Sequence, residues 1–177
     1  LAALNAAKCK ANPLSAIEVN IAGTQKLVSA AQDIGIRRLV YVSTAHVYGA
    51  PLIGNIEEAL PTRGVHPYAW THRAAEDVVL GASGLEGIVL RFSNVVGAPA
   101  DPAANCWMLV APDLCRQVTR HGKITLHGDG GEHRDFLCMS DSSRAIDHAL
   151  RMPLEKTTDQ IFNVGAGISL SIRQLAE

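Results

Sequence analysis

The 177-residue sequence lacks the features that would point to a membrane, a nucleic acid or an unfolded chain. No apolar run reaches the roughly eighteen residues that a membrane-spanning helix requires. Positive charge is not in excess, because 16 Lys and Arg stand against 17 Asp and Glu, so a basic surface for nucleic acid or anionic lipid is not expected. The apolar start of the chain is followed, not preceded, by Lys8 and Lys10, unlike a signal peptide. We therefore expect a folded, cytoplasmic protein that binds neither nucleic acid nor membrane.

The sequence also lacks the spacing of a metal site or a disulfide framework. No C-x-x-C pair occurs among its four cysteines, Cys9, Cys106, Cys115 and Cys138. Three histidines fall in segments that we predict to be turns, namely His121, His127 and His133. We expect no metal site, and we predict that the cysteines are buried free thiols in a reducing compartment.

Helical and strand patterns alternate along the chain. Residues 38–43 and 87–92 are short apolar runs rich in β-branched residues, which is typical of parallel strands buried on both faces. Apolar residues at helical spacing follow Pro13 as far as Gly35, and a second helix is predicted over residues 67–80. This order of helix, strand, helix and strand indicates βαβ units, and hence an α/β fold with a parallel sheet.

The second half of the chain is predicted to contain shorter elements. We expect helices over residues 106–121 and 142–152, the latter capped by Asp141. Strands are predicted over residues 123–127, 134–139 and 161–164. Ser171 and Gln174 have the spacing of a capping box that opens a further helix.

Two sets of glycines are interpreted as turn-forming residues. Gly81, Gly84 and Gly87 have the spacing of a dinucleotide-binding loop, but they follow a helix and precede a strand. Gly165 and Gly167 follow a strand, but no third glycine comes before the next helix. A phosphate-binding loop needs three glycines between a strand and the start of a helix, so neither set is predicted to bind phosphate.

Hydroxyl groups and an aromatic pair carry the chemistry that the sequence offers. Ser43 and Thr44 follow directly on a buried strand, and in an open α/β sheet ligands bind at the carboxyl ends of the strands. Tyr68 and His72 are four residues apart at the start of a predicted helix, so both project from one face. A phenol beside a basic group and an alcohol suits proton transfer coupled to hydride transfer at a carbinol carbon. Taken alone, such a pair is more often a core tyrosine and a surface histidine.

Several short motifs occur in an order that resembles one enzyme family. They are N-x-x-G-T at residues 20–24, S-T-A-x-V-Y-G at 43–49, R-x-x-N-x-x-G at 91–97, G-D-G at 128–130, R-D-F at 134–136 with Asp141, and N-x-G-x-G at 163–167. Over essentially all of its length the chain therefore resembles the NAD-dependent sugar-nucleotide epimerases and dehydratases of the extended short-chain dehydrogenase/reductase family, typified by UDP-glucose 4-epimerase.

This resemblance implies a Rossmann-like doubly wound parallel sheet, truncated at its N-terminus, with a small substrate-binding subdomain. Residues 1–97 would form a partial NAD-binding domain. Residues 98–177 would form the substrate-binding region, with the chain returning to the sheet around residues 141–165. In the family the first three strands and the glycine-rich turn lie upstream of the position of Leu1, so this chain by itself is expected to bind NAD feebly. A homodimer is expected for the full-length protein.

The resemblance also implies roles for individual residues. Thr44 would hydrogen-bond the reacting sugar oxygen, and Tyr68 would be the acid/base that removes the hydroxyl proton while NAD accepts hydride. His72 stands where the family has a lysine, whose charge lowers the pKa of the tyrosine and whose ammonium holds the nicotinamide ribose. Because an imidazole is usually uncharged at neutral pH, we expect a slow or pH-shifted enzyme.

Binding roles follow from the same comparison. The cofactor would be lined by Ala2, Ala3, Asn20 and Ser43, together with Tyr68 and His72. Asn94 would contact the nucleotide-sugar substrate, most simply a UDP-sugar, and Arg134 would bind its diphosphate. A surface ion pair of Arg134 with Asp135 or Glu132 is the alternative.

Two residues bear on which reaction the resemblance implies. Family members that dehydrate the sugar carry an Asp-Glu pair directly after the Ser-Thr pair, where this chain has Ala45 and His46. The sequence therefore favours a 4-epimerase. An NAD(P)-dependent reductase or dehydrogenase, including a hydroxysteroid-dehydrogenase-like relative, is the alternative enzyme, although the R-D-F motif weighs against the steroid type. A non-catalytic, nucleotide-binding member remains the alternative of a different class.

Overall fold

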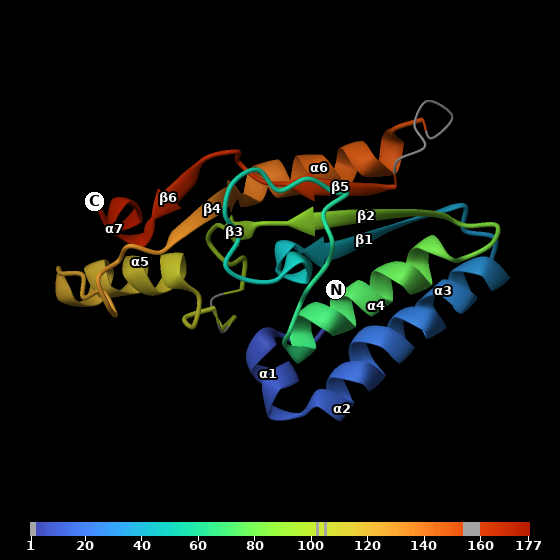
Figure 1. The fold of residues 1–177 in the computed structure, drawn as a ribbon, viewed down its shortest axis with the longest axis horizontal. Helices are drawn as coiled ribbons and strands as arrows, with labels where there is room; N and C mark the ends of the chain where they lie inside the picture. Colours follow the sequence, from blue (N-terminus) through green and yellow to red (C-terminus); the bar gives the residue numbers. More distant parts are fainter. Residues whose placement is uncertain (1–2, 102, 105, 154–159) are drawn as a thin grey trace. The chain divides into compact units, whose positions relative to one another are not determined.

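The computed structural model describes residues 3–101, 103–104, 106–153 and 160–177, and it shows an α/β protein built around a parallel sheet (Figure 1). The chain divides into two compact units. The first unit comprises Leu1–Phe92 and Ala145–Asn163, and the second comprises Ser93–Arg144 and Val164–Glu177. Within the described residues, no helix is long and apolar enough to cross a membrane.

The sheet of the first unit has the strand order β1-β2-β5. Strand β1 (Arg38–Thr44) pairs in parallel with β2 (Glu86–Phe92) over their full lengths, from Arg38 opposite Glu86 to Thr44 opposite Phe92. Strand β5 (Ile161–Val164) lies on the other side of β2, which is buried along nearly its whole length. Central strands buried on both faces read as continuous apolar runs, which is why the sequence indicated β2 so clearly.

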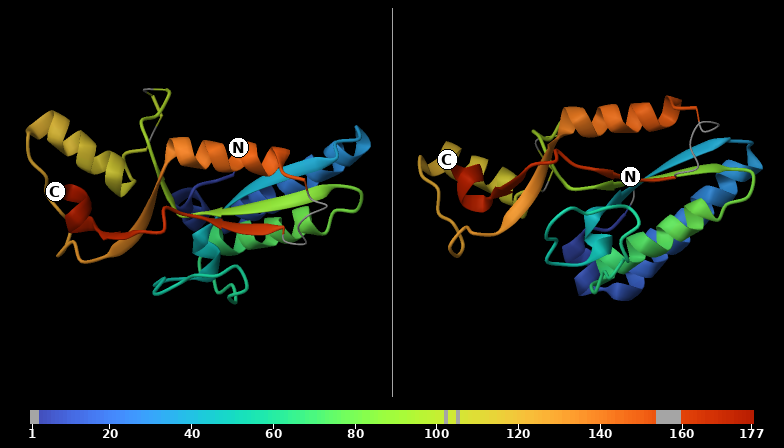
Figure 2. Two further views of the ribbon diagram at one scale, coloured as in Figure 1. Left: turned by 90° about the horizontal axis from the view of Figure 1, so that it is seen from above. Right: turned by 45° about the horizontal axis from the view of Figure 1, so that its top comes forward.

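Helices cover both faces of this sheet. The helices α3 (Gly23–Asp33) and α4 (Pro67–Leu80) lie on one face, and α6 (Met139–Arg151) runs along the other (Figures 1 and 2). Val28 and Ala31 of α3 pack with Val79 of α4 and with Leu85 in a buried cluster beneath the strands. The sheet with helices on both faces is the doubly wound arrangement that the sequence predicts.

Gly87 is needed for the close approach of α4 to the sheet. A Cβ atom at this position would lie 2.5 Å from the carbonyl oxygen of Val79, which is too close for any side chain. Gly84 has a positive φ of 71° and does form a turn. The interpretation of these glycines as turn-forming is therefore right for Gly84, whereas Gly87 is a packing residue.

A chain of short helices precedes α3. Asn5 caps α1 (Ala6–Ala11), and Asn12 caps α2 (Pro13–Ala16), which continues through the π-helical turn η1 (Ile17–Ala22) into α3. The helical spacing that follows Pro13 thus corresponds to one run of helix with a π-helical segment inside it.

The second unit holds a smaller mixed sheet with the order β3-β4-β6. Strand β3 (Asn94–Val96) is parallel to β4 (His133–Cys138), and β4 is antiparallel to β6 (Ser169–Ser171). Two helices accompany it, α5 (Val110–His121) and α7 (Ile172–Ala176). Ser171 and Gln174 form the predicted capping box at the start of α7.

Some elements of the second half differ from the prediction. Residues 123–127 form no strand: the Thr125 amide donates its hydrogen bond to the Gln117 side chain of α5 at 2.7 Å instead of to a neighbouring strand. Helix α6 begins at Met139, so Asp141 is not its cap and instead pairs with Arg144 inside the first turn. All four cysteines are free, but the prediction of burial holds fully only for Cys9, since Cys115 and Cys138 are exposed.

Candidate active site

The first part of the site is the end of strand β1. Thr44 closes the strand, and its hydroxyl accepts a hydrogen bond from the His46 amide at 3.2 Å. This contact caps the 3-10 helix η2 (Ala45–Tyr48), which ends at Gly49 with a φ of 101°. A threonine favours both roles, because its β-branched side chain suits a strand and its hydroxyl suits a cap.

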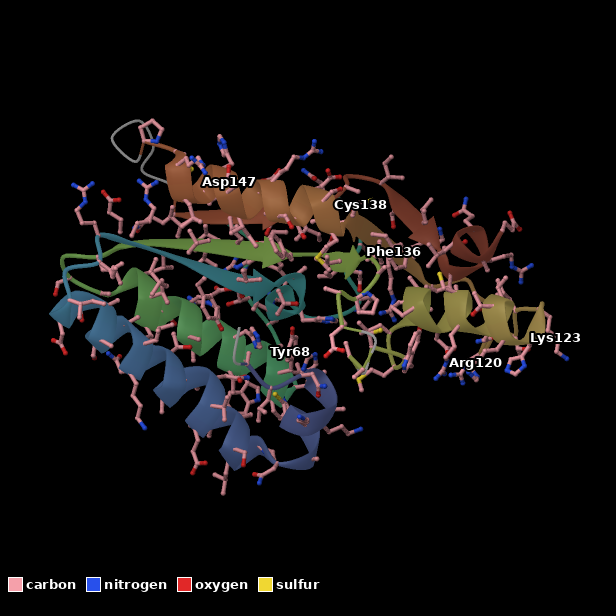
Figure 3. All side chains as sticks on the ribbon, turned by 180° about the vertical axis from the view of Figure 1, so that it is seen from behind. Tyr68, Arg120, Lys123, Phe136, Cys138 and Asp147 are labelled. Atoms are coloured by element: carbon pink, nitrogen blue, oxygen red, sulfur yellow. The ribbon has the colours of Figure 1, made fainter. Side chains whose placement is uncertain are left out.

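The second part is the start of helix α4. His66 caps the helix through Nδ1, which accepts a hydrogen bond from the Ala69 amide at 3.3 Å, and Pro67 occupies the first helical turn. Tyr68 therefore lies in the first turn and His72 one turn later, on the same face (Figure 3 labels Tyr68). The sequence predicted that Tyr68 and His72 share one helix face, but it did not predict the role of His66 as the helix cap. Its position directly before a proline in the first helical turn could have indicated that role.

The structure brings Tyr68 and Thr44 together. Burial raises the pKa of the Tyr68 phenol above its ordinary value, and a hydrogen bond with the Thr44 side chain opposes that rise. The nearby Cys9 thiol adds a smaller upward effect on the pKa. The side chains of Thr44 and Tyr68, which are predicted to share a substrate oxygen, are thus neighbours at the carboxyl end of a parallel strand.

His72 packs directly against Tyr68, with their ring centroids 4.2 Å apart. Its Nδ1 lies 2.7 Å from the Tyr68 carbonyl oxygen, which can only accept, so Nδ1 carries the proton. Burial lowers the pKa of His72, while the hydrogen bond to Tyr68 and the charge of Glu76 act in the opposite direction. The imidazole is therefore neutral near neutral pH, with an unprotonated Nε2.

Further imidazole groups surround the phenol. The His66 ring stacks on the Tyr68 ring at a centroid distance of 6.2 Å, and the His46 ring meets it edge-on at 6.0 Å. His46 and His66 also contact each other at 5.6 Å. Tyr68 consequently has aromatic neighbours from η2 as well as from α4.

A buried ion pair lies one turn beyond His72. Glu76 is fully buried, and Arg91 is 3% exposed. Their side chains form two close contacts, Nε to Oε1 at 3.1 Å and Nη2 to Oε2 at 2.7 Å. Ser43, which the resemblance assigns to the cofactor, donates its hydroxyl to Glu76 at 2.5 Å. Sequence analysis missed this cluster, although Glu76 continues the spacing of four residues that links Tyr68 and His72.

Asn20 serves as an anchor inside the protein. Its side-chain oxygen accepts from the Leu4 amide at 2.8 Å, and its amide nitrogen donates to Thr71 Oγ1 at 3.0 Å and, more weakly, to Cys9 Sγ at 3.6 Å. Both ends of the amide are thus occupied by protein atoms. Asn20 therefore holds the N-terminal segment against α4, and its assignment to the cofactor stays a prediction.

The two alanines predicted to line the cofactor lie at the chain start. Ala2 is outside the described residues. Ala3 is exposed and belongs to no strand, and it precedes α1 by a short loop. The assignment of both alanines to the cofactor stays a prediction.

The substrate residues predicted in the second half lie in the second unit. Asn94 donates its side-chain amide to the Asp135 carbonyl oxygen at 2.9 Å. Arg134 pairs with Glu132 at 2.7 Å on an exposed part of the surface, the alternative that the sequence left open. Arg134 also lines a cavity of about 250 Å³ together with Asp113, His127 and others.

Asp135 has a structural role that sequence analysis did not assign. Its Oδ1 accepts from Ser93 Oγ at 2.6 Å and from the Ala166 amide at 2.9 Å, and Oδ2 accepts from the Gly167 amide at 2.8 Å. A Cβ on Gly165 would lie 3.0 Å from this carboxylate. The carboxylate of the R-D-F motif therefore binds the loop of the N-x-G-x-G motif, and the absence of a side chain at Gly165 leaves space for it.

Metal binding finds no support in the described part of the chain, where no group of three or more His, Cys, Asp or Glu side chains could hold an ion.

Most of the chain matches one family. The model of the NAD dependent epimerase/dehydratase family matches residues 2–165. The chain is 32% identical over 162 residues to mouse dTDP-D-glucose 4,6-dehydratase, a match that covers 90% of this chain and 43% of that protein.

Solved structures give the same result. UDP-glucose 4-epimerase of Thermotoga maritima, solved with UDP-glucose, has a TM-score of 0.87 at 25% identity, over 99% of this chain and 57% of that chain. UDP-glucose 4-epimerase of Thermus thermophilus, solved with NAD, has a TM-score of 0.79 at 29% identity, over 99% and 58%. The chain spans about half the length of the relatives it matches. On the match of the family model over most of its length, the chain belongs to the NAD-dependent epimerase/dehydratase family of enzymes.

Proposed function

We propose that this chain is the catalytic part of an NAD-dependent nucleotide-sugar 4-epimerase, with Tyr68 as the acid/base and Thr44 as its partner on the substrate. The observation that carries the proposal is the position of Tyr68 beside the end of β1: its ring lies 6.0 Å from the ring of His46, two residues after Thr44, and the Thr44 side chain lowers the pKa of the phenol. Chemistry of this kind needs one group that accepts a hydroxyl proton and a second that fixes the oxygen.

The residues around Tyr68 fit a nicotinamide cofactor at its reactive end. Tyr68 is only partly buried, and beside it the unprotonated Nε2 of His72, a residue that is 4% exposed, would be the acceptor for a ribose hydroxyl. When bound, NAD supplies the hydride acceptor and later the hydride donor at the sugar carbon. Ser43 and Asn20 contribute indirectly, because their polar atoms are engaged by Glu76, Leu4 and Thr71.

The protein's own groups would handle the proton. Tyr68 takes the proton of the C4 hydroxyl at its phenolate oxygen as that carbon is oxidised to a ketone. Thr44 holds the same oxygen by a hydrogen bond, which keeps it within reach of Tyr68. After the keto sugar has turned over in the site, C4 would be reduced on its opposite face while Tyr68 returns the proton to the same oxygen, and the C4 epimer forms.

An epimerase is favoured over a dehydratase by the residues after Thr44. Loss of water needs a further acid and a further base, and the family's dehydratases carry an Asp-Glu pair there. This chain has Ala45, which has no ionisable group, followed by His46. Its relatives include both kinds of enzyme, so these two positions carry the distinction.

A UDP-sugar is the substrate that we propose. The Arg134 guanidinium can bind a diphosphate with two parallel hydrogen bonds, and here it would exchange its exposed partner Glu132 for the substrate. Exposed ion pairs contribute little, so this exchange costs about 1 kcal/mol or less.

The test is the interconversion of UDP-glucose and UDP-galactose by the complete gene product in the presence of NAD. We expect slow epimerisation, and we expect Tyr68→Phe to reduce the rate by roughly a hundredfold or more. Tyr41→Phe is the matched control, because the buried Tyr41 hydroxyl has no hydrogen-bond partner in the described part of the chain. Formation of a 4-keto-6-deoxy sugar would show instead that the protein is a dehydratase. Net release of NADH would show a dehydrogenase, and binding of the ligands without turnover would show a non-catalytic member of the family.

A further inference from the structure

The buried carboxylate of Glu76 connects the two elements that carry the candidate catalytic pair. Glu76 belongs to α4, two turns after Tyr68 and on the same helix face. Its Oε1 accepts a hydrogen bond from the Ser43 hydroxyl at 2.5 Å. Ser43 immediately precedes Thr44 at the end of β1. One side-chain contact thus fastens the strand that carries the alcohol to the helix that carries the phenol.

Arg91 makes this contact rigid. It comes from β2, where its backbone lies opposite Ser43 in the parallel register. Its guanidinium holds both oxygens of Glu76, with Nε and Nη2, and a bidentate pair of this kind fixes direction as well as distance. Held by the Ser43 hydroxyl and by two nitrogens of Arg91, the carboxylate has little freedom to turn away from Ser43.

Arg91 is itself held from the opposite side. Its Nη1 donates to the Tyr48 hydroxyl at 2.7 Å, and Tyr48 donates to the Asn163 side-chain oxygen at 2.8 Å. The ion pair therefore has supports on η2 and at the end of β5, and Glu76 is not free to follow a shift of the strand end.

The other charged and titratable groups near Glu76 do not replace Arg91. Arg73 approaches Oε2 only to 3.9 Å and pairs mainly with Asp77. Tyr41 and His72 both sense the Glu76 charge but make no hydrogen bond to it that the described contacts include.

We propose that Glu76 is a positioning residue: by holding Ser43 against α4, it sets the separation of the Thr44 and Tyr68 hydroxyl groups. This inference rests on the proposed function, because its consequence for catalysis requires Tyr68 to be the acid/base. The geometric part concerns the Thr44–Tyr68 hydrogen bond and is measurable without turnover.

The variant that isolates this role is Ser43→Ala. It removes the hydroxyl that Glu76 holds and leaves the Glu76–Arg91 pair intact, so the fold is retained. The matched control is Val79→Ala, which removes buried methyl groups from the same helix and does not touch Ser43. Both variants lose stability, but only Ser43→Ala loosens the strand end from the helix.

The first readout is the titration of Tyr68 in the complete gene product, followed by NMR with ¹³C-labelled tyrosine and assigned with Tyr68→Phe. The Thr44 hydrogen bond lowers the pKa of Tyr68, so loosening it raises the pKa. The groups that face Tyr68 and must be considered in the fit are His46, His66, His72 and the Cys9 thiol. In Ser43→Ala the titration moves to higher pH, and in Val79→Ala it stays in place.

The second readout is the pH dependence of epimerisation. In Ser43→Ala we expect the part of the pH–rate profile that is controlled by the ionisation of Tyr68 to move to higher pH. At neutral pH, kcat should fall by about tenfold for each unit by which the pKa of Tyr68 rises, and KM should stay within about twofold of the native value. An unchanged Tyr68 titration in Ser43→Ala, or an equal change in Val79→Ala, overturns the proposal. If the native protein shows no epimerisation at all, the proposed function fails, and the NMR titration still decides whether Glu76 positions the pair.

Discussion

Replacing His72 by lysine tests the electrostatics of the site most severely. The His72 ring lies 4.2 Å from the Tyr68 ring and is neutral near neutral pH, because burial lowers its pKa. Burial raises the pKa of Tyr68, and within the described part of the chain no cation is among the groups that shift it. The native phenol therefore lacks the positive neighbour that would favour its phenolate.

The size of the effect follows from the separation. Two unit charges 4 Å apart interact by about 4 kcal/mol at an effective dielectric constant of about 20. An opposite charge at close range shifts a pKa by about 1–3 units, so an ammonium at position 72 should lower the pKa of Tyr68 by that amount, or about 1.4–4 kcal/mol. The Glu76 carboxylate, which favours the charged form of the group at position 72, helps the new lysine to stay protonated.

The assay is kcat/KM for UDP-sugar epimerisation between about pH 6 and pH 10, in the complete gene product with saturating NAD. His72→Lys should move the part of the pH–rate profile that is controlled by the ionisation of Tyr68 to lower pH. It should also raise the rate at neutral pH by about ten- to a thousandfold. His72→Met is the control, since it fills similar space without a charge and should give no gain. A folded His72→Lys variant with the native rate and the native pH profile would refute the reasoning.

Three further predictions concern stability. Arg91→Met leaves the buried Glu76 carboxylate unpaired and should cost about 3–5 kcal/mol in urea unfolding, much of which a double variant with Glu76→Leu recovers; a loss below about 1 kcal/mol contradicts this account of the ion pair. The folded protein holds His72 with a lowered pKa, so the unfolded chain binds more protons and stability falls as pH drops below about 6.5; His72→Gln should remove this part of the slope, and an unchanged slope would exclude His72 as its source. Asp135→Ala removes the acceptors of two loop amides and should speed hydrogen exchange at Ala166 and Gly167 by about tenfold, equivalent to about 1.4 kcal/mol; native exchange rates there would show that the loop does not depend on the carboxylate.

The elements that position the site are the ones that the sequence predicts best. Helix α4 begins at Pro67 and ends at Leu80, as its spacing and its proline indicate, and β1 extends the predicted strand only by Thr44. The convergence of Thr44 and Tyr68 follows from a general rule, since ligand groups gather where parallel strands end. The spacing of apolar residues is enough to predict a helix or strand where one face of that element is strongly buried.

Contacts between distant residues could not be predicted in the same way. Glu76 meets Ser43 across 33 residues of sequence and Arg91 across 15, and neither partner stands out in its own motif. Asn20 looks like a ligand in its motif, but its amide is taken up by Leu4 and Thr71. The predicted strand at residues 123–127 fails for a related reason, since the side chain of Gln117 holds that backbone in place of a neighbouring strand.

The central claim is that the phenol of Tyr68 and the alcohol of Thr44 hold one sugar oxygen between them. A crystal structure of the complete gene product with NAD and UDP-glucose measures this directly. We predict that the C4 oxygen lies within about 2.6–3.2 Å of both Tyr68 Oη and Thr44 Oγ1. A bound sugar whose C4 oxygen contacts neither hydroxyl, in an enzyme that epimerises it, would contradict the claim.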